Sequence, residues 1–465
     1  MKAKTILLAV GCWLAAGCEA EAPEPYGAVP TEAQVEWQRM EINMFCHFGP
    51  NTFSGAEWGD GKEGADVFAP EGLDCGQWVG VAADAGMGGI ILTAKHHDGY
   101  CLWPSAQSTH TVAYSRWREG KGDVLRELRD AIDGYNTRTG GRMQMGLYLS
   151  PWDRNHPAYG TEEYNKVFAA TLREVHTAYG PLFEQWFDGA CGEGPTGKRQ
   201  EYDWRLFNST VLERNPRCVI FSDIGPGCRW VGNEEGRAGS TCWSTLDTAG
   251  CAPGTGNPPS ATLETGTRHG SAWMAAEVDV SIRPGWFWHG DEEPKSVEEL
   301  MEIYYQSVGH NALLLLNVPP NRQGRIDAAD SLRLMEFRAE RERVFAHDLA
   351  QEATVKGHHL RGRRYRASQV TDTAYHSYWA APDTVGEVVM EWADSKEVKL
   401  IVLQEYIPLG QRVERWEAEW DGGRCEGTTI GYKRIVRLPE GTSTRRLTLR
   451  MHGEAAPLMN RIAVY

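Results

Sequence analysis

The chain has 465 residues, more than one hydrophobic core usually organises, so its length predicts two domains. A formal net charge of −15 argues against a nucleic acid or an anionic membrane surface as a partner. The 18 Trp and 17 Tyr residues favour a ligand with flat, amphipathic faces, such as a sugar.

The N-terminus has the pattern of a targeting signal. Two lysines precede an apolar run over 6–16, which is too short to span a bilayer. The run closes with L-A-A-G-C, which resembles a bacterial lipobox ending at a lipidated Cys18; an ordinary signal peptide cut nearby is the alternative. We therefore expect a lipoprotein signal peptide over 1–17, a tether over 18–30, and an exported protein with a lipid anchor, in the periplasm or at the cell surface.

From residue 31 to residue 346 the sequence alternates apolar runs with amphipathic patterns. The apolar runs are typical of parallel strands covered on both faces, and they span 42–48, 89–97, 145–151, 183–188, 218–223 and 313–318. The amphipathic patterns predict helices over 73–85, 124–135, 161–179, 202–213, 297–308 and 328–345. No G-x-G-x-x-G follows the first strand, so a dinucleotide-binding sheet is not favoured. The alternation predicts an α/β fold, a (β/α)8-like TIM barrel that forms the catalytic domain.

The helical period disappears in the last part of the chain, residues 347–465. Short strand patterns replace it, over 388–392, 398–403, 434–438, 446–451 and 462–465. Turns such as Asp421-Gly422-Gly423 separate them. We therefore expect a C-terminal all-β domain, a β-sandwich.

Polar and aromatic residues gather where the predicted barrel strands end: His47, His96, His97, Tyr148, Trp186, Asp188 and Asp223. In a barrel, the C-terminal strand ends form the face where active sites lie. Alternation along 183–188 puts Glu184, Trp186 and Asp188 on one side, so an aromatic plate lies beside a carboxylate, which suits a sugar ring. A buried Asp188 that caps the next helix is the other interpretation.

The segment His96-His97-Asp98 invites a metal hypothesis. Neighbours on a strand point to opposite faces, so the two histidines cannot bind one ion without a bend, and no H-E-x-x-H spacing supports a metal elsewhere. Core histidines are a second interpretation. We favour histidines that bind hydroxyl groups in a polar pocket, and we expect no metal and no cofactor.

Two loops add acidic residues to this face. Glu57 and Trp58 follow the first strand and again pair a carboxylate with a ring, although ordinary loop packing would give the same pattern. The glycine-rich stretch 222–236 carries Glu234 and Glu235. An acid on this loop can approach Asp188 across a bound ring, as two-carboxylate glycoside hydrolysis requires. A solvated acidic loop is the alternative.

These residues belong to a set of motifs in a fixed order: H-F-G-P-N-T-F, E-W-G, H-H-D-G-Y, Y-L-S-P-W, W-F-D-G-A, G-N-E-E-G, R-P-G-W-F, L-L-L-N-V-P-P-N, L-Q-E-Y-I-P-L-G-Q-R-V and G-T-T-I-G-Y-K-R. The set resembles the alpha-L-fucosidases of glycoside hydrolase family 29, from about residue 35 to the C-terminus. It looks like the subgroup that prefers alpha-1,3 and alpha-1,4 linkages in branched glycans.

The resemblance implies a retaining, metal-independent hydrolase that acts on a fucosylated oligosaccharide or glycoconjugate. It assigns Asp188 as the nucleophile and Glu234 as the acid/base, with Glu235 as the nearest rival. It also implies a set of substrate-binding residues: His47, Glu57, Trp58, His96, His97, Tyr148, Trp186, Arg229 and Trp286. Two other hypotheses stay open at this point: a carbohydrate-binding surface lipoprotein with an inactive barrel, and a metal-dependent hydrolase centred on His96, His97 and Asp98.

Overall fold

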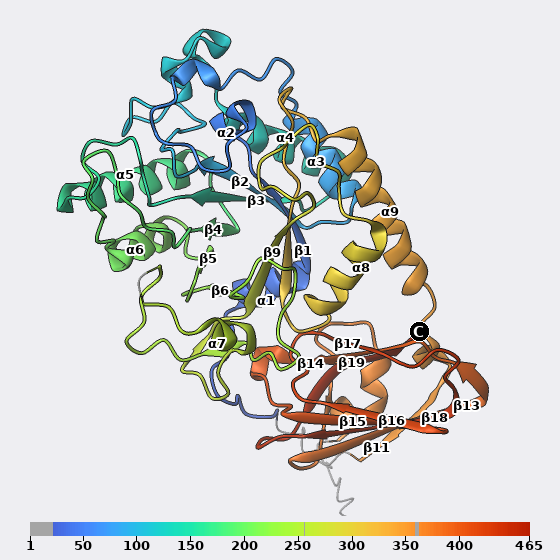
Figure 1. Ribbon diagram of the computed structural model, residues 1–465. Coiled ribbons are helices and arrows are strands. Elements are labelled where there is room, and N and C mark those ends of the chain that lie inside the picture. The colour runs from blue at the N-terminus through green and yellow to red at the C-terminus, as the bar shows by residue number, and fades with distance from the viewer. Residues whose placement is uncertain (1–21, 255, 359–361) are drawn as a thin grey trace, which may run out of the picture.

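The computed structural model describes residues 22–254, 256–358 and 362–465 (Figure 1). The predicted signal peptide and the lipidated Cys18 lie outside these ranges. Within them, no helix combines the length and the apolar character needed to cross a bilayer.

In the described part of the chain, eight parallel strands close into a barrel in the order β1-β10-β9-β6-β5-β4-β3-β2. Nearly every residue of these strands is buried. Their bounds are β1 Ile42–Cys46, β2 Gly89–Lys95, β3 Gln144–Leu149, β4 Glu184–Trp186, β5 Val219–Ser222, β6 Cys228–Trp230, β9 Ala276–Ser281 and β10 Leu313–Asn317. The predicted barrel is therefore confirmed.

Helices pack around the barrel strands, as Figure 1 shows. Their apolar stripes face the sheet; in α5, for example, Tyr164, Phe168 and Leu172 are buried in the main core. Side chains cap several N-termini: Ser296 and Glu299 form a capping box at α8. The helices are α2 Pro50–Ser54, α3 Cys75–Asp84, α4 Val124–Thr139, α5 Glu162–Ala178, α6 Trp204–Arg214, α7 Ser260–Thr265, α8 Val297–Gln306 and α9 Ala328–Val344.

The helix α1 (Glu32–Met40) lies before the first strand and packs at the barrel. Its Trp37 is 1% exposed and belongs to the cluster that fills the barrel interior, together with Phe45, Tyr148 and Trp186. Because α1 leads directly into the start of β1, it lies at the N-terminal end of the barrel, opposite the strand ends that carry the polar residues. The indole of Trp37 therefore fills the barrel from its base.

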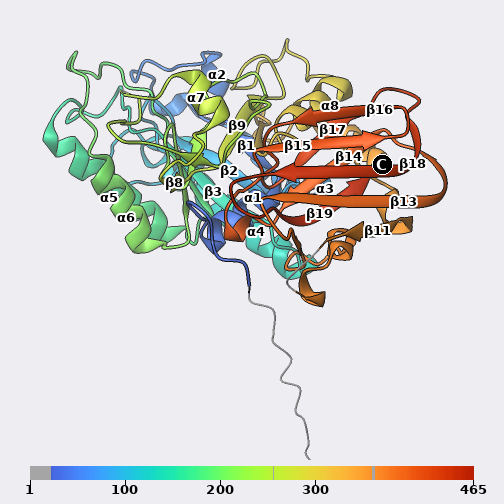
Figure 2. The ribbon, with the colours of Figure 1, turned by 90° about the horizontal axis from the view of Figure 1, so that it is seen from below.

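The C-terminal part forms two antiparallel sheets that face each other, which confirms the predicted β-sandwich. The two layers are seen in Figure 1, and Figure 2 shows the same strands overlapping from below. One sheet has the order β11-β13-β18-β15-β16 and the other the order β12-β19-β14-β17. Val388, Leu449, Ile401 and Ile462, from both sheets, share one apolar core. The strands are β11 Thr354–Gly357, β12 Trp379–Ala380, β13 Val385–Glu397, β14 Leu400–Glu405, β15 Arg415–Trp420, β16 Gly423–Gly427, β17 Arg434–Arg437, β18 Ser443–His452 and β19 Leu458–Val464.

The sandwich is bonded to the barrel and to the loops at its side. The Glu41 carboxylate accepts hydrogen bonds from Tyr304 of α8 and Tyr432 of the sandwich, and it pairs with Lys433. The segment that follows the Glu234 loop is also held. The backbone N–H of Ser244, for example, donates to Gln411 Oε1 at 2.7 Å.

The sandwich also holds the start of the described chain. The backbone N–H of Tyr26 donates to the carbonyl of Leu409 at 3.0 Å, and the Arg412 guanidinium donates to the carbonyl of Glu24. Residues 22–30, the described part of the predicted tether, therefore begin against the sandwich.

Candidate active site

The polar and aromatic strand ends surround one cavity of about 190 Å³. This volume is below the roughly 300 Å³ at which pockets for drug-sized ligands begin, so it suits a single sugar ring. The lining comprises Phe45, His47, Glu57, Trp58, His96, His97, Tyr148, Trp186, Asp188, Ala190, Glu234, Asp279 and Trp286. Every residue predicted to act on the substrate lies here except Arg229.

Asp188 lies two residues beyond the end of β4, and neighbouring groups orient its carboxylate. Oδ2 accepts from the Tyr148 hydroxyl at 2.9 Å and lies 3.5 Å from Nε2 of His97. Oδ1 accepts from the backbone N–H of Ala190 at 2.8 Å. The side chain is still 24% exposed. The carboxylate is thus fixed in direction and open to the cavity, as a nucleophile must be.

Three histidines form a buried wall of the cavity. Nδ1 of His47 lies 2.9 Å from Asn317 Oδ1, and Nδ1 of His97 lies 2.8 Å from Ser150 Oγ. Burial lowers the pKa of His47 to about 3 and also lowers the pKa of His96 and of His97. All three imidazoles are therefore neutral near pH 7, and a neutral ring can donate to one sugar hydroxyl or accept from another.

Glu57 joins two loops at the mouth of the cavity. Its carboxylate accepts from the backbone N–H groups of Trp286 at 2.8 Å and Phe287 at 3.3 Å, and it lies 2.7 Å from Nε2 of His289. Next to it, Trp58 is 58% exposed and contacts His97 edge to face, with 5.3 Å between ring centroids. An exposed indole at the mouth offers a flat surface for the apolar face of a sugar.

Glu234 and Glu235 are neighbours with different surroundings. Glu234 lines the cavity, where Trp286 Nε1 donates to its Oε2 at 3.3 Å. Burial raises the pKa of Glu234, and the nearby charge of Asp188 raises it further. Both residues are exposed, but Glu235 does not line the cavity and instead pairs with Arg237 at 2.8 Å. Of these two glutamates, Glu234 is the one that lines the cavity and has the raised pKa of a general acid.

The prediction that Arg229 binds the substrate is wrong, because Arg229 does not line the cavity. It lies in β6 between Cys228 and Trp230, which point into the barrel, so its own side chain points outward. The guanidinium is fully buried and donates to the backbone carbonyls of Leu263, at 2.8 Å, and Met274. Arg229 thus supports the loops behind the site and does not contact the cavity.

Asp279 is a cavity residue that sequence reasoning missed. It lies in β9, and its Oδ1 accepts from Trp230 Nε1 at 2.9 Å. Burial raises its pKa well above the ordinary value, with the charge of Glu234 as the next cause. The signal in the sequence was E-V-D-V over 277–280, where Glu277 and Asp279 alternate with valines and so share one face of a strand.

The remaining polar strand ends do not form a metal site. Asp223 does not line the cavity, and its carboxylate accepts from Asn257 Nδ2 at 2.7 Å. The ligand atoms of His96, His97 and Asp98 do not all converge. In the described ranges, ligand atoms lie within 4.8 Å of one another in only one group of three His, Cys, Asp or Glu residues, made of Glu184, Cys228 and Glu277.

Comparisons with known proteins agree with this geometry. The family model described as alpha-L-fucosidase matches residues 25–338. Alpha-L-fucosidase 1 of Arabidopsis thaliana is 40% identical over 95% of this chain and 88% of its own length. The crystal structure of SpGH29 has 37% identity and a TM-score of 0.89, covering 96% of this chain and 99% of its own. A Ruminococcus gnavus GH29 fucosidase in complex with fucose has 33% identity and a TM-score of 0.86, covering 96% of both chains. The chain belongs to the alpha-L-fucosidase family, glycoside hydrolase family 29, and is a glycoside hydrolase.

Proposed function

We propose that the protein is a retaining exo-alpha-L-fucosidase that removes terminal alpha-1,3- or alpha-1,4-linked fucose from branched glycans. The observation that carries the proposal is the pairing of Asp188 and Glu234 in one cavity, the first oriented by Tyr148 and the second with its pKa raised by burial. Two carboxyls with different protonation states are what a retaining glycosidase needs.

In the proposed mechanism, Asp188 attacks the anomeric carbon while Glu234 protonates the departing glycosidic oxygen. A covalent fucosyl-enzyme forms at Asp188. Glu234, now ionised, takes a proton from water, and the resulting hydroxyl displaces Asp188 with a second inversion. The neutral histidines hold the sugar hydroxyls without adding charge beside the nucleophile. The small cavity accepts one terminal residue, which supports an exo mode of cleavage.

The test of this proposal follows the anomeric configuration of released fucose by proton NMR. The alpha anomer should appear first, because two inversions restore the original configuration. Lewis-type trisaccharides should be cleaved and 2'-fucosyllactose should be cleaved poorly. First appearance of the beta anomer would contradict the retaining mechanism, and equal rates on both glycans would contradict the linkage preference.

Replacement of the proposed nucleophile Asp188 separates catalysis from binding. Asp188→Gly should abolish turnover, and azide should partly restore it and yield a fucosyl azide, because the small anion takes the place of the missing carboxylate. A wild-type protein that binds fucosylated glycans and releases no fucose would instead support a carbohydrate-binding lipoprotein with an inactive barrel.

We also propose that the protein is exported and carries a lipid on Cys18, on the basis of its lipobox-like N-terminus. In a bacterial host, an alkyne-labelled fatty acid should be incorporated into the wild-type chain and not into Cys18→Ser. Labelling that is equal in both chains would contradict the assignment to Cys18.

A further inference from the structure

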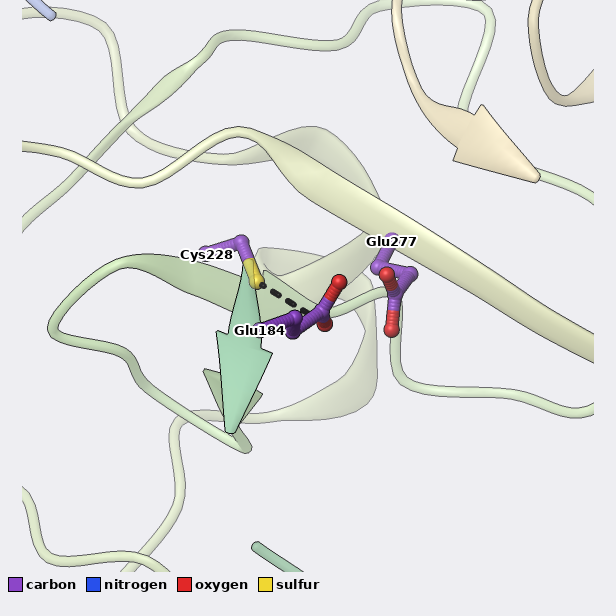
Figure 3. Close-up of side chains that lie close together, drawn as sticks. All are labelled: Glu184, Cys228 and Glu277. Atoms are coloured by element: carbon purple, nitrogen blue, oxygen red, sulfur yellow. Dashed lines mark hydrogen bonds between the residues drawn. The ribbon is translucent and has the colours of Figure 1, made fainter. Parts of the chain in front are cut away.

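Three side chains meet inside the barrel, one layer below the cavity: Glu184 from β4, Cys228 from β6 and Glu277 from β9 (Figure 3). Each side chain is fully buried. The thiol and one oxygen of each carboxyl lie within 4.8 Å of one another. Two residues further along β9 is Asp279, so a single step of the strand alternation, about 7 Å, separates this layer from the cavity.

Hydrogen-bond donors reach three of the four carboxyl oxygens. Glu184 Oε2 accepts from Trp37 Nε1 at 2.7 Å, and Glu184 Oε1 accepts from the Cys228 thiol at 3.9 Å. Glu277 Oε1 accepts from Trp186 Nε1 at 2.9 Å. Glu277 Oε2 is buried and has no donor. A buried acceptor without a donor is costly, whereas a protonated carboxyl oxygen can itself donate.

The electrostatics of the pair also indicate that one of the two carboxyls is protonated. No Lys or Arg of the described chain forms an ion pair with either carboxyl, and two ionised carboxylates cannot lie side by side in a buried site. Burial raises the pKa of Glu184 to about 7. Burial raises the pKa of Glu277 well above its ordinary value, and the charge of Glu184 raises it further. Of the two carboxyls, Glu277 therefore keeps its proton to the higher pH.

We propose that Glu184 and Glu277 share one proton as a buried acid pair, which acts as a positioning device for the nucleophile Asp188. The proton on Glu277 Oε2 is donated to Glu184, whose two oxygens then accept from Trp37, Cys228 and Glu277. This part of the inference concerns the pair alone. Its catalytic consequence rests on the proposed function of Asp188.

A continuous set of contacts leads from the pair to Asp188. Glu277 fixes the indole of Trp186, which lies between two rings: Phe221, with centroids 4.0 Å apart, and Tyr148, with centroids 5.1 Å apart and planes at 24°. The hydroxyl of Tyr148 donates to Asp188 Oδ2 at 2.9 Å. A rotation of Trp186 would therefore displace Tyr148 and the carboxylate that it orients.

A bound metal ion is the alternative occupant, because a thiolate with two carboxylates can ligate zinc. The bonds from Trp37 and Trp186 already occupy one oxygen of each carboxyl. Burial and the charge of Glu184 raise the pKa of the Cys228 thiol well above its ordinary value, so the sulfur keeps its proton and donates. These contacts favour the shared proton.

The experiment compares Glu277→Leu with its conservative partner Glu277→Gln. In Glu277→Leu the Trp186 indole N–H loses its acceptor, and kcat per active site should fall about tenfold or more, with a smaller change in KM. In Glu277→Gln the amide oxygen still accepts from Trp186 and the NH₂ still donates to Glu184, so most of the lost kcat should return. Circular dichroism at the assay temperature verifies that each variant is folded.

Glu184→Gln should lower kcat, whereas Glu277→Gln should largely keep it. This difference shows which of the two glutamates carries the proton. The new NH₂ group of Glu184→Gln must face Trp37, Cys228 or Glu277, all of which donate, so kcat should fall about as far as in Glu277→Leu. Other buried carboxyls such as Asp279 also have a raised pKa, so the infrared measurement is a difference spectrum. The spectrum of the wild type minus that of Glu277→Gln should contain the C=O band of one buried protonated carboxyl.

Three results would overturn the proposal: a loss of kcat in Glu277→Gln equal to that in Glu277→Leu, an unchanged kcat in Glu277→Leu, or a stoichiometric metal in the wild type that Glu277→Gln lacks. Failure of the proposed function is distinguishable, since the wild type would then release no fucose while the infrared band remained.

Discussion

At the scale of single residues, Glu234 and Glu235 show how position decides chemistry. They are adjacent glutamates on one loop, and their side chains are chemically identical. Glu234 faces the cavity and the indole of Trp286, whereas Glu235 faces solvent and Arg237. Burial raises the pKa of Glu234, because desolvation disfavours its charged form.

The first prediction compares Glu234→Ala with Glu235→Ala. If Glu234 is the general acid, as we propose, its loss should lower kcat/KM on Lewis-type glycans by about 10²- to 10⁴-fold, and much less on aryl fucosides whose leaving group needs no proton. Glu235→Ala should stay close to the wild type on both. Steady-state kinetics on the two substrate classes provides the measurement. A dead Glu235→Ala beside an active Glu234→Ala would move the acid/base role by one position.

The pH profile of kcat/KM also tests whether Glu234 is the general acid. A carboxyl with a raised pKa keeps its proton to a higher pH than usual, so kcat/KM on natural glycans should fall only as the pH rises through that raised pKa. This alkaline limb should disappear from the residual activity of Glu234→Ala. If the alkaline limb persists unchanged in Glu234→Ala, it reports the titration of another group.

At the scale of elements, the sequence predicts the strands that follow simple patterns and misses those that do not. The runs that became β1, β2 and β10 are continuous and apolar because helices cover them on the outside. In contrast, β6 has three residues, and β9 alternates Glu277 and Asp279 with valines. Such alternation is the pattern of a half-exposed strand, although here its polar face points into the barrel.

The same limit explains what the sequence could and could not predict of the site. His47, Tyr148 and Asp188 end recognisable strands, so their convergence follows from the barrel alone. Asp279 and Arg229 lie on the two strands that were missed. Without β6, Arg229 looks like a residue of a loop that is free to reach the substrate; with β6, strand alternation turns it outward.

At the scale of the whole molecule, the β-sandwich contributes to the site through the segment that follows Glu234. The backbone N–H of Cys242 donates to Thr429 Oγ1 at 2.8 Å, and that of Ser244 donates to Gln411 Oε1 at 2.7 Å. Both N–H groups belong to buried residues. The loop that carries Glu234 is therefore held at its far end by a separate domain.

We predict that Gln411→Ala weakens both stability and acid catalysis. It leaves the buried N–H of Ser244 without an acceptor, which should lower the free energy of unfolding by about 1–3 kcal/mol. The looser loop should also lower kcat on glycans about threefold or more, and less on aryl fucosides. Urea unfolding and steady-state kinetics supply the two measurements.

Glu419→Ala on the same sandwich is the matched control. Its exposed ion pair with Arg450, at 3.2 Å, should contribute about 0–1 kcal/mol and leave kcat unchanged. If Gln411→Ala were destabilised but kept the wild-type kcat on both substrate classes, the sandwich would brace the barrel without guiding the acid.

The hydrogen bond between Tyr26 and Leu409 fixes where the described chain begins. The described chain starts at the sandwich and enters the barrel through α1, at the end opposite the cavity. If Cys18 carries the lipid that we propose, the attachment lies close in sequence to the sandwich and to α1. We then expect the cavity to open away from the membrane, toward glycans in the surroundings.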